Sequence, residues 1–270
     1  MPGKGVIRRV KDALWRTSDL FGIRPVRIRS GPARGSQICA PIRRWPSFRR
    51  ALHEAPILAV IDRRVGEGQT VLDLGASYGY FTLAFAARVG SVGRVIAFEP
   101  ESRAANALRR TLALNGLSQV RLIEAAVAET SRTHFLRVPE NETMAYLTAR
   151  PNGTAVDSVS LDDWLSRPPT EDAPQRVDWI KIDVEGAEAQ VLSGAEETLT
   201  RYRPRILCEV HGSPAFPGGA RETVERLRRA GYRLTPVPAA GRSLEERLHT
   251  VEAAPAGPRL HTFHLLAEAD

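Results

Sequence analysis

The sequence of 270 residues predicts an α/β fold, in which a parallel sheet carries helices on both faces. Two observations support this prediction. From residue 70 onward, short apolar runs alternate with segments in which apolar side chains recur every three or four positions, and this alternation is typical of strands connected by helices. A glycine-containing turn directly follows the first apolar run, and open α/β sheets bind their ligands beyond strand ends of this kind.

The predicted strands follow one another in a regular order. We expect them at residues 71–74, 94–98, 120–123, 179–183, 206–210, 232–237 and 262–266. The helix after the second strand is expected to end at Asn115 and Gly116, because Asn-Gly is a usual C-terminal signal. The last two strands are expected to form a hairpin-like pair with a long loop between them.

Residues 131–159 interrupt this order. They contain strand-like pieces at 134–138 and 145–148 and a turn at 151–153, so we expect a small β-insertion in the main fold. Residues 166–177 are rich in proline and acidic residues and are expected to form a surface loop.

The N-terminal region differs in charge from the rest of the chain. Residues 1–50 hold 13 Lys and Arg and 2 Asp, whereas the other 220 residues hold 25 Lys and Arg and 29 Asp and Glu. We therefore expect a basic arm over residues 1–55 and a main domain over residues 56–270. The arm is expected to contain an amphipathic helix at residues 6–14 and an irregular part at 17–46, and a second helical segment at 46–64 continues into the main domain. Its first helix is expected to pack against the protein or to contact a membrane surface peripherally.

Three further features of the sequence bear on the cellular compartment of the protein. No apolar stretch reaches the roughly 20 residues that a membrane-spanning helix needs, and the N-terminus lacks the apolar run of a secretory signal. The two cysteines of the sequence, Cys39 and Cys208, are expected to be buried thiols in a reducing compartment. These observations predict a cytoplasmic protein.

The strongest local signal is the segment Val-Leu-Asp-Leu-Gly-Ala-Ser-Tyr-Gly at residues 71–79. It predicts a strand, a glycine turn and a helix. Gly75 lets the backbone approach a ligand closely, and Gly79 lets the following helix pack against the sheet. Glu99 ends the next strand and is placed to accept hydrogen bonds from both hydroxyls of a ribose.

The turn lacks the second close-approach glycine that makes room for pyrophosphate in dinucleotide-binding proteins, because Ser77 occupies that position. With Asp73 just before the turn, this favours S-adenosylmethionine, which carries an amino-acid moiety and a sulfonium in place of phosphates. Ala76 belongs to the same turn and is counted with the cofactor-binding residues. Glu124, at the end of the third strand, is expected to accept a hydrogen bond from the adenine amino group.

A second polar group is expected where the fourth and fifth strands of the core end. Asp183 ends the fourth strand, and Glu185 follows in a turn that Gly186 permits. His211 leaves the fifth strand and is expected to lie beside Asp183, because neighbouring parallel strands end at the same edge of a sheet. These residues are expected to face a bound acceptor.

Several segments together resemble the FkbM-type S-adenosylmethionine-dependent methyltransferases. The matching pieces are LDLGASYGYFT, VIAFEP, SLDDW, IKIDVEGAEAQVLSGA and ILCEVH. The resemblance covers residues 55–212 and implies a Rossmann-like sheet of seven strands. It also implies O-methylation of a hydroxyl on a sugar, a glycolipid or a secondary metabolite. It assigns Gly75, Ser77 and Glu99 to the cofactor pocket, and Asp183, Glu185 and His211 to the transfer site.

The chemistry of methyl transfer to an alcohol suggests roles for the second group. A base near the hydroxyl typically accelerates such a reaction by about 10²–10⁴-fold. We expect His211 to be this base, oriented by a carboxylate and with an ordinary pKa near 6.5; Asp183 is the rival for the role. The alternative is a divalent metal, Mg²⁺ or Mn²⁺, held by Asp183, Glu209 and His211.

Three other functions compete with this interpretation. A nicotinamide-dependent oxidoreductase would need a G-x-G-x-x-G turn, which Ser77 and Tyr78 do not supply. A non-catalytic module that binds a nucleotide or a membrane is the second alternative. An RNA methyltransferase is the third, but the aromatic share of 6% leaves no obvious platform for stacking bases. The expected partner is therefore a small-molecule or glycolipid acceptor and no nucleic acid; the oligomeric state stays open.

Overall fold

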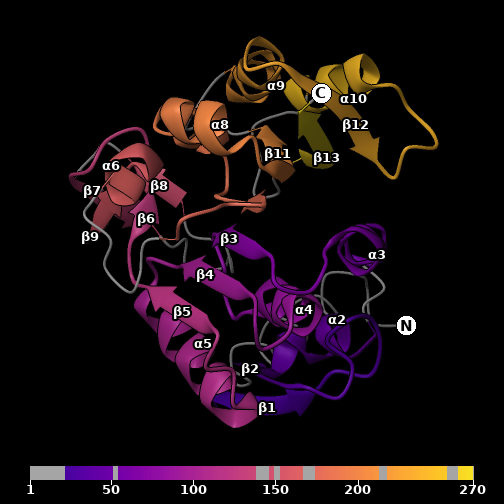
Figure 1. Ribbon diagram of the computed structural model, residues 1–270, viewed down its shortest axis with the longest axis vertical. Helices are drawn as coiled ribbons and strands as arrows, with labels where there is room; N and C mark the ends of the chain where they lie inside the picture. The colour runs from indigo at the N-terminus through magenta and orange to yellow at the C-terminus, as the bar shows by residue number, and fades with distance from the viewer. Residues whose placement is uncertain are drawn as a thin grey trace, which may run out of the picture.

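A seven-stranded sheet forms the centre of the molecule (Figure 1). The computed structural model describes residues 22–50, 54–137, 146–148, 153–166, 174–212, 218–253 and 261–269. The strand order is β12 (Tyr232–Val237), β13 (His261–Ala269), β11 (Arg205–Gly212), β10 (Trp179–Ile182), β3 (Thr70–Leu74), β4 (Arg94–Phe98) and β5 (Val120–Ile123). Strands β11, β10, β3, β4 and β5 are mutually parallel. All seven predicted strands are confirmed.

The edge of the sheet near the C-terminus is antiparallel. Strand β13 runs antiparallel to both β11 and β12, which confirms the predicted pairing of the last two strands. The loop between them contains α10 (Leu244–Glu252), which was not predicted. Its start carries a capping box, in which the Ser243 hydroxyl oxygen accepts from the Glu246 backbone and the Glu246 carboxylate accepts from the Ser243 backbone.

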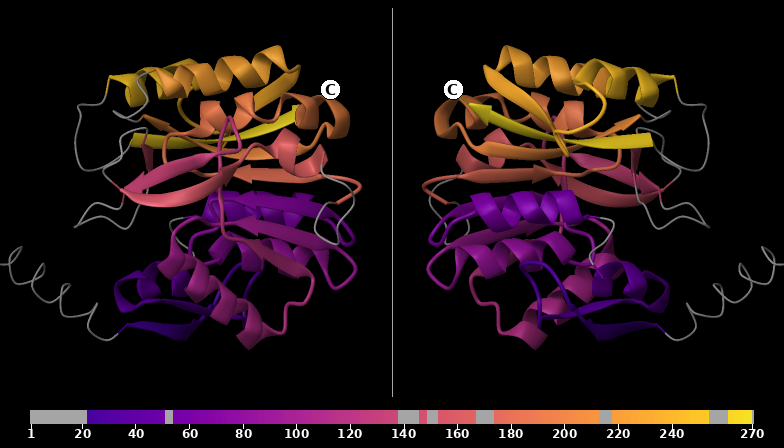
Figure 2. Two further views of the ribbon diagram at one scale, coloured as in Figure 1. Left: turned by 90° about the vertical axis from the view of Figure 1, so that its left-hand side faces the viewer. Right: turned by 90° about the vertical axis from the view of Figure 1, so that its right-hand side faces the viewer.

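Helices cover both faces of the sheet, as predicted (Figure 2). Because side chains of a strand alternate between faces, Val71 and Leu72 belong to different hydrophobic clusters. One face packs against α3 (Ala55–Arg64), α4 (Tyr80–Val89) and α5 (Ser102–Asn115). The other packs against α6 (Leu161–Ser166), α7 (Glu188–Ser193), α8 (Glu196–Tyr202), α9 (Gly219–Arg229) and α10.

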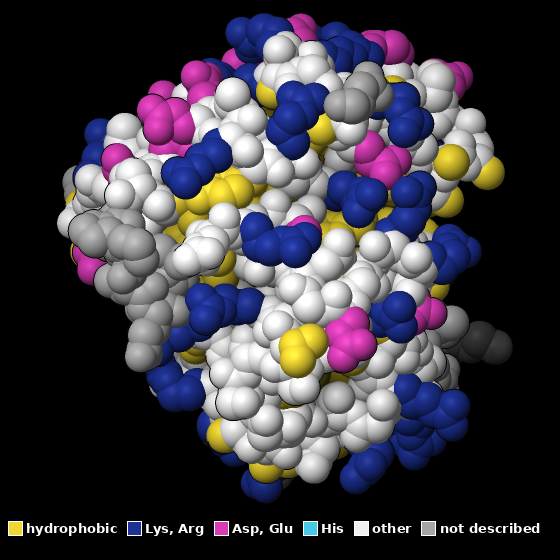
Figure 3. Space-filling view, viewed as in Figure 1, with side chains coloured by type: hydrophobic (Ala, Val, Ile, Leu, Met, Phe, Trp, Pro, Cys, Tyr) yellow, Lys and Arg dark blue, Asp and Glu magenta, His cyan; other side chains and the backbone are white. Residues whose placement is uncertain are grey.

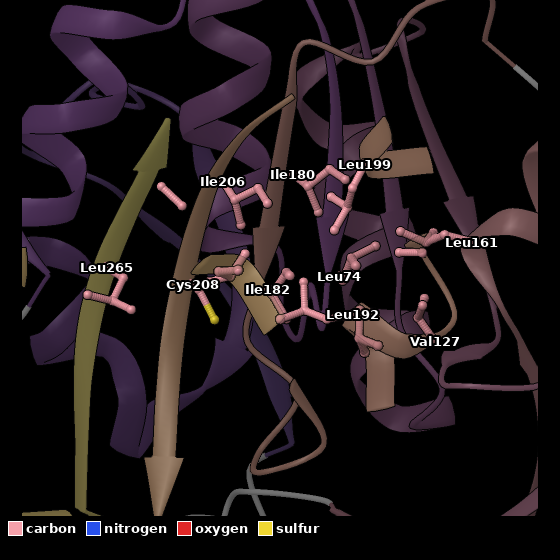
Figure 4. Packing of buried hydrophobic residues seen from close by; sticks show 14 of the residues in the cluster. Leu74, Val127, Leu161, Ile180, Ile182, Leu192, Leu199, Ile206, Cys208 and Leu265 are labelled. Carbon is pink, nitrogen blue, oxygen red and sulfur yellow. The ribbon is translucent and has the colours of Figure 1, made fainter. Parts of the chain in front are cut away.

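In the second of these interfaces, apolar side chains of the strands that lead to the site are buried against the helices. Figure 4 shows apolar side chains of adjacent strands directed to one side, where they meet Leu161, Leu192 and Leu199 from three different helices. The strand residues Leu74, Ile180, Ile182, Ile206, Cys208 and Leu265 are each at most 1% exposed. Burial of one such aliphatic side chain stabilises a fold by about 1.5–3 kcal/mol. The polar groups that follow these strands therefore project from a fixed edge.

The N-terminal region corrects one prediction. Residues 17–46 were expected to be irregular, but β1 (Ile23–Arg27) and β2 (Gln37–Pro41) form an antiparallel hairpin within this range. Arginine, proline and glycine dominate the composition of this segment and obscure its period-two pattern, in which Val26 and Ile28 are buried. The Cys39 backbone N–H donates to the Thr111 hydroxyl oxygen of α5 at 2.9 Å, so the hairpin is joined to the same core as the sheet.

After the hairpin come η1 (Ile42–Arg44), α2 (Trp45–Arg50) and α3. Two helices therefore occupy the region 46–64, where one helical segment was predicted. The predicted amphipathic helix at 6–14 lies outside the described residues. Both cysteines are buried and free, as expected.

The β-insertion is confirmed as a separate four-stranded sheet. Its order is β6 (Ala126–Val127), β9 (Thr154–Val159), β7 (Thr133–Arg137) and β8 (Tyr146–Thr148). Of the surface loop predicted at 166–177, residues 167–173 lie outside the described part of the chain. Lys and Arg side chains are spread over the face shown in Figure 3, with Asp and Glu side chains among them. Within the described residues, no helix combines the length and the apolar character that crossing a membrane requires.

Candidate functional site

The candidate site lies at the carboxyl ends of four neighbouring strands, β4, β3, β10 and β11. The glycine turn follows β3, Glu99 follows β4, Asp183 follows β10, and His211 lies at the end of β11. This edge is where open α/β sheets bind ligands. The structure thus brings both predicted groups of polar residues to one edge of the sheet.

Gly75 allows the turn after β3 to contact the turn after β10. Its φ angle is +76°, and a Cβ built on it would lie 1.8 Å from the carbonyl oxygen of Asp183. The sequence predicted that Gly75 gives room to a ligand, whereas the closest group in the structure is the backbone of the chain itself. Any side chain at Gly75 would push apart the two turns that carry the site.

Gly79 has a similar role one turn later. A Cβ at Gly79 would lie 2.4 Å from Cδ1 of Leu108, so this glycine lets the start of α4 approach α5; the predicted partner was the sheet. Between the two glycines, Ser77 has a positive φ of 50°, which is uncommon for a residue other than glycine. Ala76 is buried against Ala97 and Leu108, and its backbone N–H donates to the Phe98 carbonyl oxygen.

Glu99 is held in a fixed position at the end of β4, where the sequence placed it. One carboxylate oxygen accepts from the Ser77 backbone N–H at 2.7 Å and the other from the Glu101 backbone N–H at 2.8 Å. Burial raises the pKa of Glu99 to about 7, although these two hydrogen bonds lower it. Each carboxylate oxygen has a further lone pair, so both could accept a hydrogen bond from a ligand.

Asp73 lies beneath the turn and is fully buried. It accepts a hydrogen bond of 2.6 Å from the Thr82 hydroxyl and lies 3.3 Å from the Lys181 ammonium. Lys181 also donates to the Gly75 carbonyl oxygen at 2.9 Å and lies 3.2 Å from Asp183 Oδ2. Burial favours the neutral amine, but Asp183 and Asp73 raise the pKa of Lys181 above its ordinary value. Lys181 therefore joins the two halves of the site.

Glu124 lies apart from these contacts. It follows β5, its side chain is 49% exposed, and its carboxylate forms an ion pair with Arg109 of α5. A contact with an adenine ring would require this exposed pair to share or release the carboxylate.

Four carboxylates surround His211, and we call these five residues the carboxylate–histidine cluster: Asp183, Glu185, Glu188, Glu209 and His211. The imidazole Nδ1 lies 2.8 Å from Glu188 Oε1. On the other side of the ring, Nε2 lies 3.4 Å from Glu185, 3.7 Å from Glu209 and 3.9 Å from Asp183. The predicted proximity of Asp183 and His211 is confirmed.

The charges of the cluster correct the expected protonation of His211. Burial of the ring acts to lower the pKa, but Glu188, Glu209 and Asp183 raise it to about 10, whereas the sequence suggested a value near 6.5. Burial, followed by the charge of Asp183, raises the pKa of Glu185 to about 8. In this arrangement the imidazole carries a proton at neutral pH and is not a free base.

Sequence reasoning missed Glu188, Lys181 and His264 as members of the site. Glu188 was given no role in the predicted site. Lys181 lies directly opposite Asp73 in the register of β10 and β3, and His264 lies directly opposite Glu209 in the register of β13 and β11. For Lys181 and His264, strand order was the missing information, since it shows that these charges meet Asp73 and Glu209.

Comparison with known proteins identifies the domain. The family model described as "Methyltransferase FkbM domain" matches residues 73–234. The chain belongs to the FkbM methyltransferase family. The matched range starts at Asp73 and includes both turns, Glu99 and all of the carboxylate–histidine cluster, so the candidate site lies within the FkbM domain.

Two curated proteins with similar sequences are also named as methyltransferases. The chain is 30% identical to 2-O-methyltransferase NoeI of Sinorhizobium fredii (strain NBRC 101917 / NGR234), over 49% of this chain and 60% of NoeI. It is 28% identical to methyltransferase sdnD of Sordaria araneosa, over 58% of this chain and 70% of sdnD. Among solved structures, the methyltransferase FkbM of Methylobacillus flagellatus KT aligns with a TM-score of 0.47 at 18% identity, over 81% of this chain and 46% of that one.

Proposed function

We propose that this FkbM protein is an S-adenosylmethionine-dependent O-methyltransferase that acts on a hydroxyl of a sugar, a glycolipid or a secondary metabolite. The observation that carries the proposal is the pairing of the FkbM domain with a fixed, buried carboxylate, Glu99, beside the turn after β3. The name of NoeI, a 2-O-methyltransferase, supports oxygen as the accepting atom. The buried free thiols Cys39 and Cys208 support a cytoplasmic location.

The residues beside the turn fit the donor. S-adenosylmethionine supplies a methyl group already activated by a sulfonium. In the proposal, Glu99 accepts hydrogen bonds from the ribose hydroxyls, and the backbone from Gly75 to Ser77 borders the amino-acid moiety. Glu124 accepts from the adenine amino group. Asp73 acts through Lys181, since its carboxylate is fully buried and paired with that ammonium.

The carboxylate–histidine cluster is the proposed place of the acceptor. Transfer to an activated methyl group depends chiefly on aligning the nucleophile, and good alignment is worth up to about 7–11 kcal/mol of the barrier. Asp183 and Glu185 follow β10 and His211 lies at the end of β11, and Asp183 contacts the turn that borders the donor in the proposal. Their charged groups suit a polar hydroxyl.

A direct assay tests the proposed function. The purified chain is incubated with S-adenosylmethionine and panels of hydroxylated sugars, glycolipids, polyketides and RNA, and products are analysed by mass spectrometry. We expect an acceptor hydroxyl to gain the mass of one CH₂ group, with S-adenosylhomocysteine formed in equal amount. Methylation of RNA alone, or calorimetric binding of NADH in preference to S-adenosylmethionine, would contradict the proposal.

Binding of S-adenosylhomocysteine is expected to weaken by about tenfold between pH 8 and pH 6, because Glu99 with a pKa of about 7 loses its charge over this range. The carboxylate accepts ribose hydroxyls best when ionised, so affinity falls as the pH falls through the pKa. Glu101, on the same loop, raises this pKa, and Lys181 lowers it. Isothermal calorimetry at several pH values measures the effect.

Glu99→Gln is the matched control for this titration. The amide keeps the shape of the side chain but has no charge to lose, so its weaker binding should not change between pH 8 and pH 6. If the variant shows the same pH dependence as the parent protein, another group is responsible.

A further inference from the structure

We propose that Asp183, Glu209 and His211 form a binding site for one divalent cation. One carboxylate oxygen from each acidic residue and Nε2 of the imidazole all lie within 4.8 Å of one another. Nε2 of His211 is 3.7 Å from Glu209 Oε1 and 3.9 Å from Asp183 Oδ1. Two ligands of one ion at about 2.1 Å from it are separated by roughly 3–4 Å, so these spacings fit a shared ion and are too long for hydrogen bonds.

The contacts behind these three atoms are the independent support. The second oxygen of Asp183 faces the Lys181 ammonium at 3.2 Å, and the second oxygen of Glu209 faces His264 at 3.2 Å. The second nitrogen of His211 contacts Glu188 at 2.8 Å. Each residue is thus held by a partner through one atom, while its other atom lies within 4.8 Å of the corresponding atoms of the other two residues.

The second ring nitrogen of a metal-binding histidine almost always donates a hydrogen bond to a carboxylate, a carbonyl oxygen or water, and this hydrogen bond fixes the orientation of the ring. Glu188 meets this requirement and is itself held, because Oε1 also accepts from the Gly186 backbone N–H at 3.0 Å. The ring of His211 is only 2% exposed, so its Nε2 faces the acidic residues and little solvent.

Glu185 offers a fourth oxygen. Its Oε2 lies 3.4 Å from His211 Nε2, is buried, and has no hydrogen-bond partner among the described residues. Apart from this ion-pair contact with His211, the oxygen accepts no hydrogen bond from any described residue, which is costly for a buried carboxylate, and a cation at the centre of the cluster would give it a direct contact. Carboxylates favour hard cations and imidazole favours transition metals, so the mixed set fits Mn²⁺, with Mg²⁺ as a weaker competitor.

The catalytic role of the ion rests on the proposed function, but the binding of the ion to the protein does not. An ion at this position would lie at the acceptor side of the domain, where a Lewis acid lowers the pKa of a bound hydroxyl. His211 would then serve as a ligand through Nε2, whose proton would pass to solvent when the ion binds, and the hydroxyl proton would also pass to solvent.

Binding of Mn²⁺ to the metal-free full-length protein tests the inference without any turnover. Electron paramagnetic resonance measures free Mn²⁺ during a titration, and we expect one ion bound per chain. Asp183→Asn and Glu209→Gln should each weaken binding at least tenfold. Glu188→Gln, which removes the orienting carboxylate, should weaken it by about 10–100-fold. An excess of Mg²⁺ should release the bound Mn²⁺.

Asp157→Asn is the matched control, since Asp157 is an exposed carboxylate on β9 of the other sheet, and this variant should bind Mn²⁺ as the parent does. Binding of S-adenosylhomocysteine confirms that each variant is folded. Failure of the parent to bind Mn²⁺ at millimolar concentration, or unchanged binding in both cluster variants, would overturn the site. Methyl transfer that persists in EDTA after such a failure would leave the proposed function intact.

Discussion

Lys181→Met is expected to lower the free energy of unfolding by about 3–5 kcal/mol, because removing one partner of a buried ion pair leaves an uncompensated charge. The Lys181 side chain is 6% exposed, and Asp73 beside it is fully buried. Methionine is similar to lysine in length, so the loss in free energy of unfolding reflects the missing charge and not a cavity. Urea denaturation at fixed pH measures the difference, with the folded fraction followed by circular dichroism.

Two control variants separate the buried charge from other causes. Asp73→Asn combined with Lys181→Met removes both charges of this pair and should recover part of the lost stability. Arg109→Met breaks the exposed pair with Glu124, in which both side chains are about half exposed, and should cost no more than about 1 kcal/mol. Equal losses in Lys181→Met and Arg109→Met would contradict the argument from burial.

The sheet could be predicted because its strands are short apolar runs with clear ends. The run at 71–74 is followed by glycine, and the run at 94–98 by Glu99 and proline, so both ends were visible in the sequence. The hairpin of β1 and β2 was missed because arginine and proline occupy the exposed positions of β1. Helix α10 was missed because the region between the last two strands was interpreted as loop, although Ser243 and Glu246 form the capping-box signature of a helix start.

The sequence predicted only those site residues whose positions follow from the ends of the strands. Asp183 and His211 were expected to meet because both follow parallel strands, and they do. Glu188 was not expected there, because its contact with His211 depends on the turn after β10. That turn has positive φ angles at Glu185 and Gly186, of 57° and 104°, and it returns the chain toward the end of β11. A single sequence does not specify such a path.

Because the proposed cation would lose its imidazole ligand, His211→Asn is expected to lower kcat by about 10²–10⁴-fold, the range typical of losing activation of a hydroxyl. The asparagine amide nitrogen takes the approximate place of Nδ1 and can still donate to Glu188, so this hydrogen bond is kept, but the lost positive charge beside four carboxylates should lower the free energy of unfolding. Nε2, the atom that faces Asp183, Glu185 and Glu209, is lost. The affinity for S-adenosylhomocysteine should stay within about twofold, because the proposed donor contact is made by Glu99, which follows β4 on the other side of the turn.

His249→Asn is the matched control for this prediction, since His249 is exposed on α10 and its loss should leave kcat unchanged. His211→Gln places an amide near Nε2 instead and breaks the contact with Glu188, so it should destabilise the fold more than His211→Asn does. If His211→Asn turns over at a rate close to that of the parent protein, the buried imidazole serves only to neutralise its four carboxylates. In that case the reaction must draw on Asp183 or Glu185 alone, and the cluster would contribute to stability more than to catalysis.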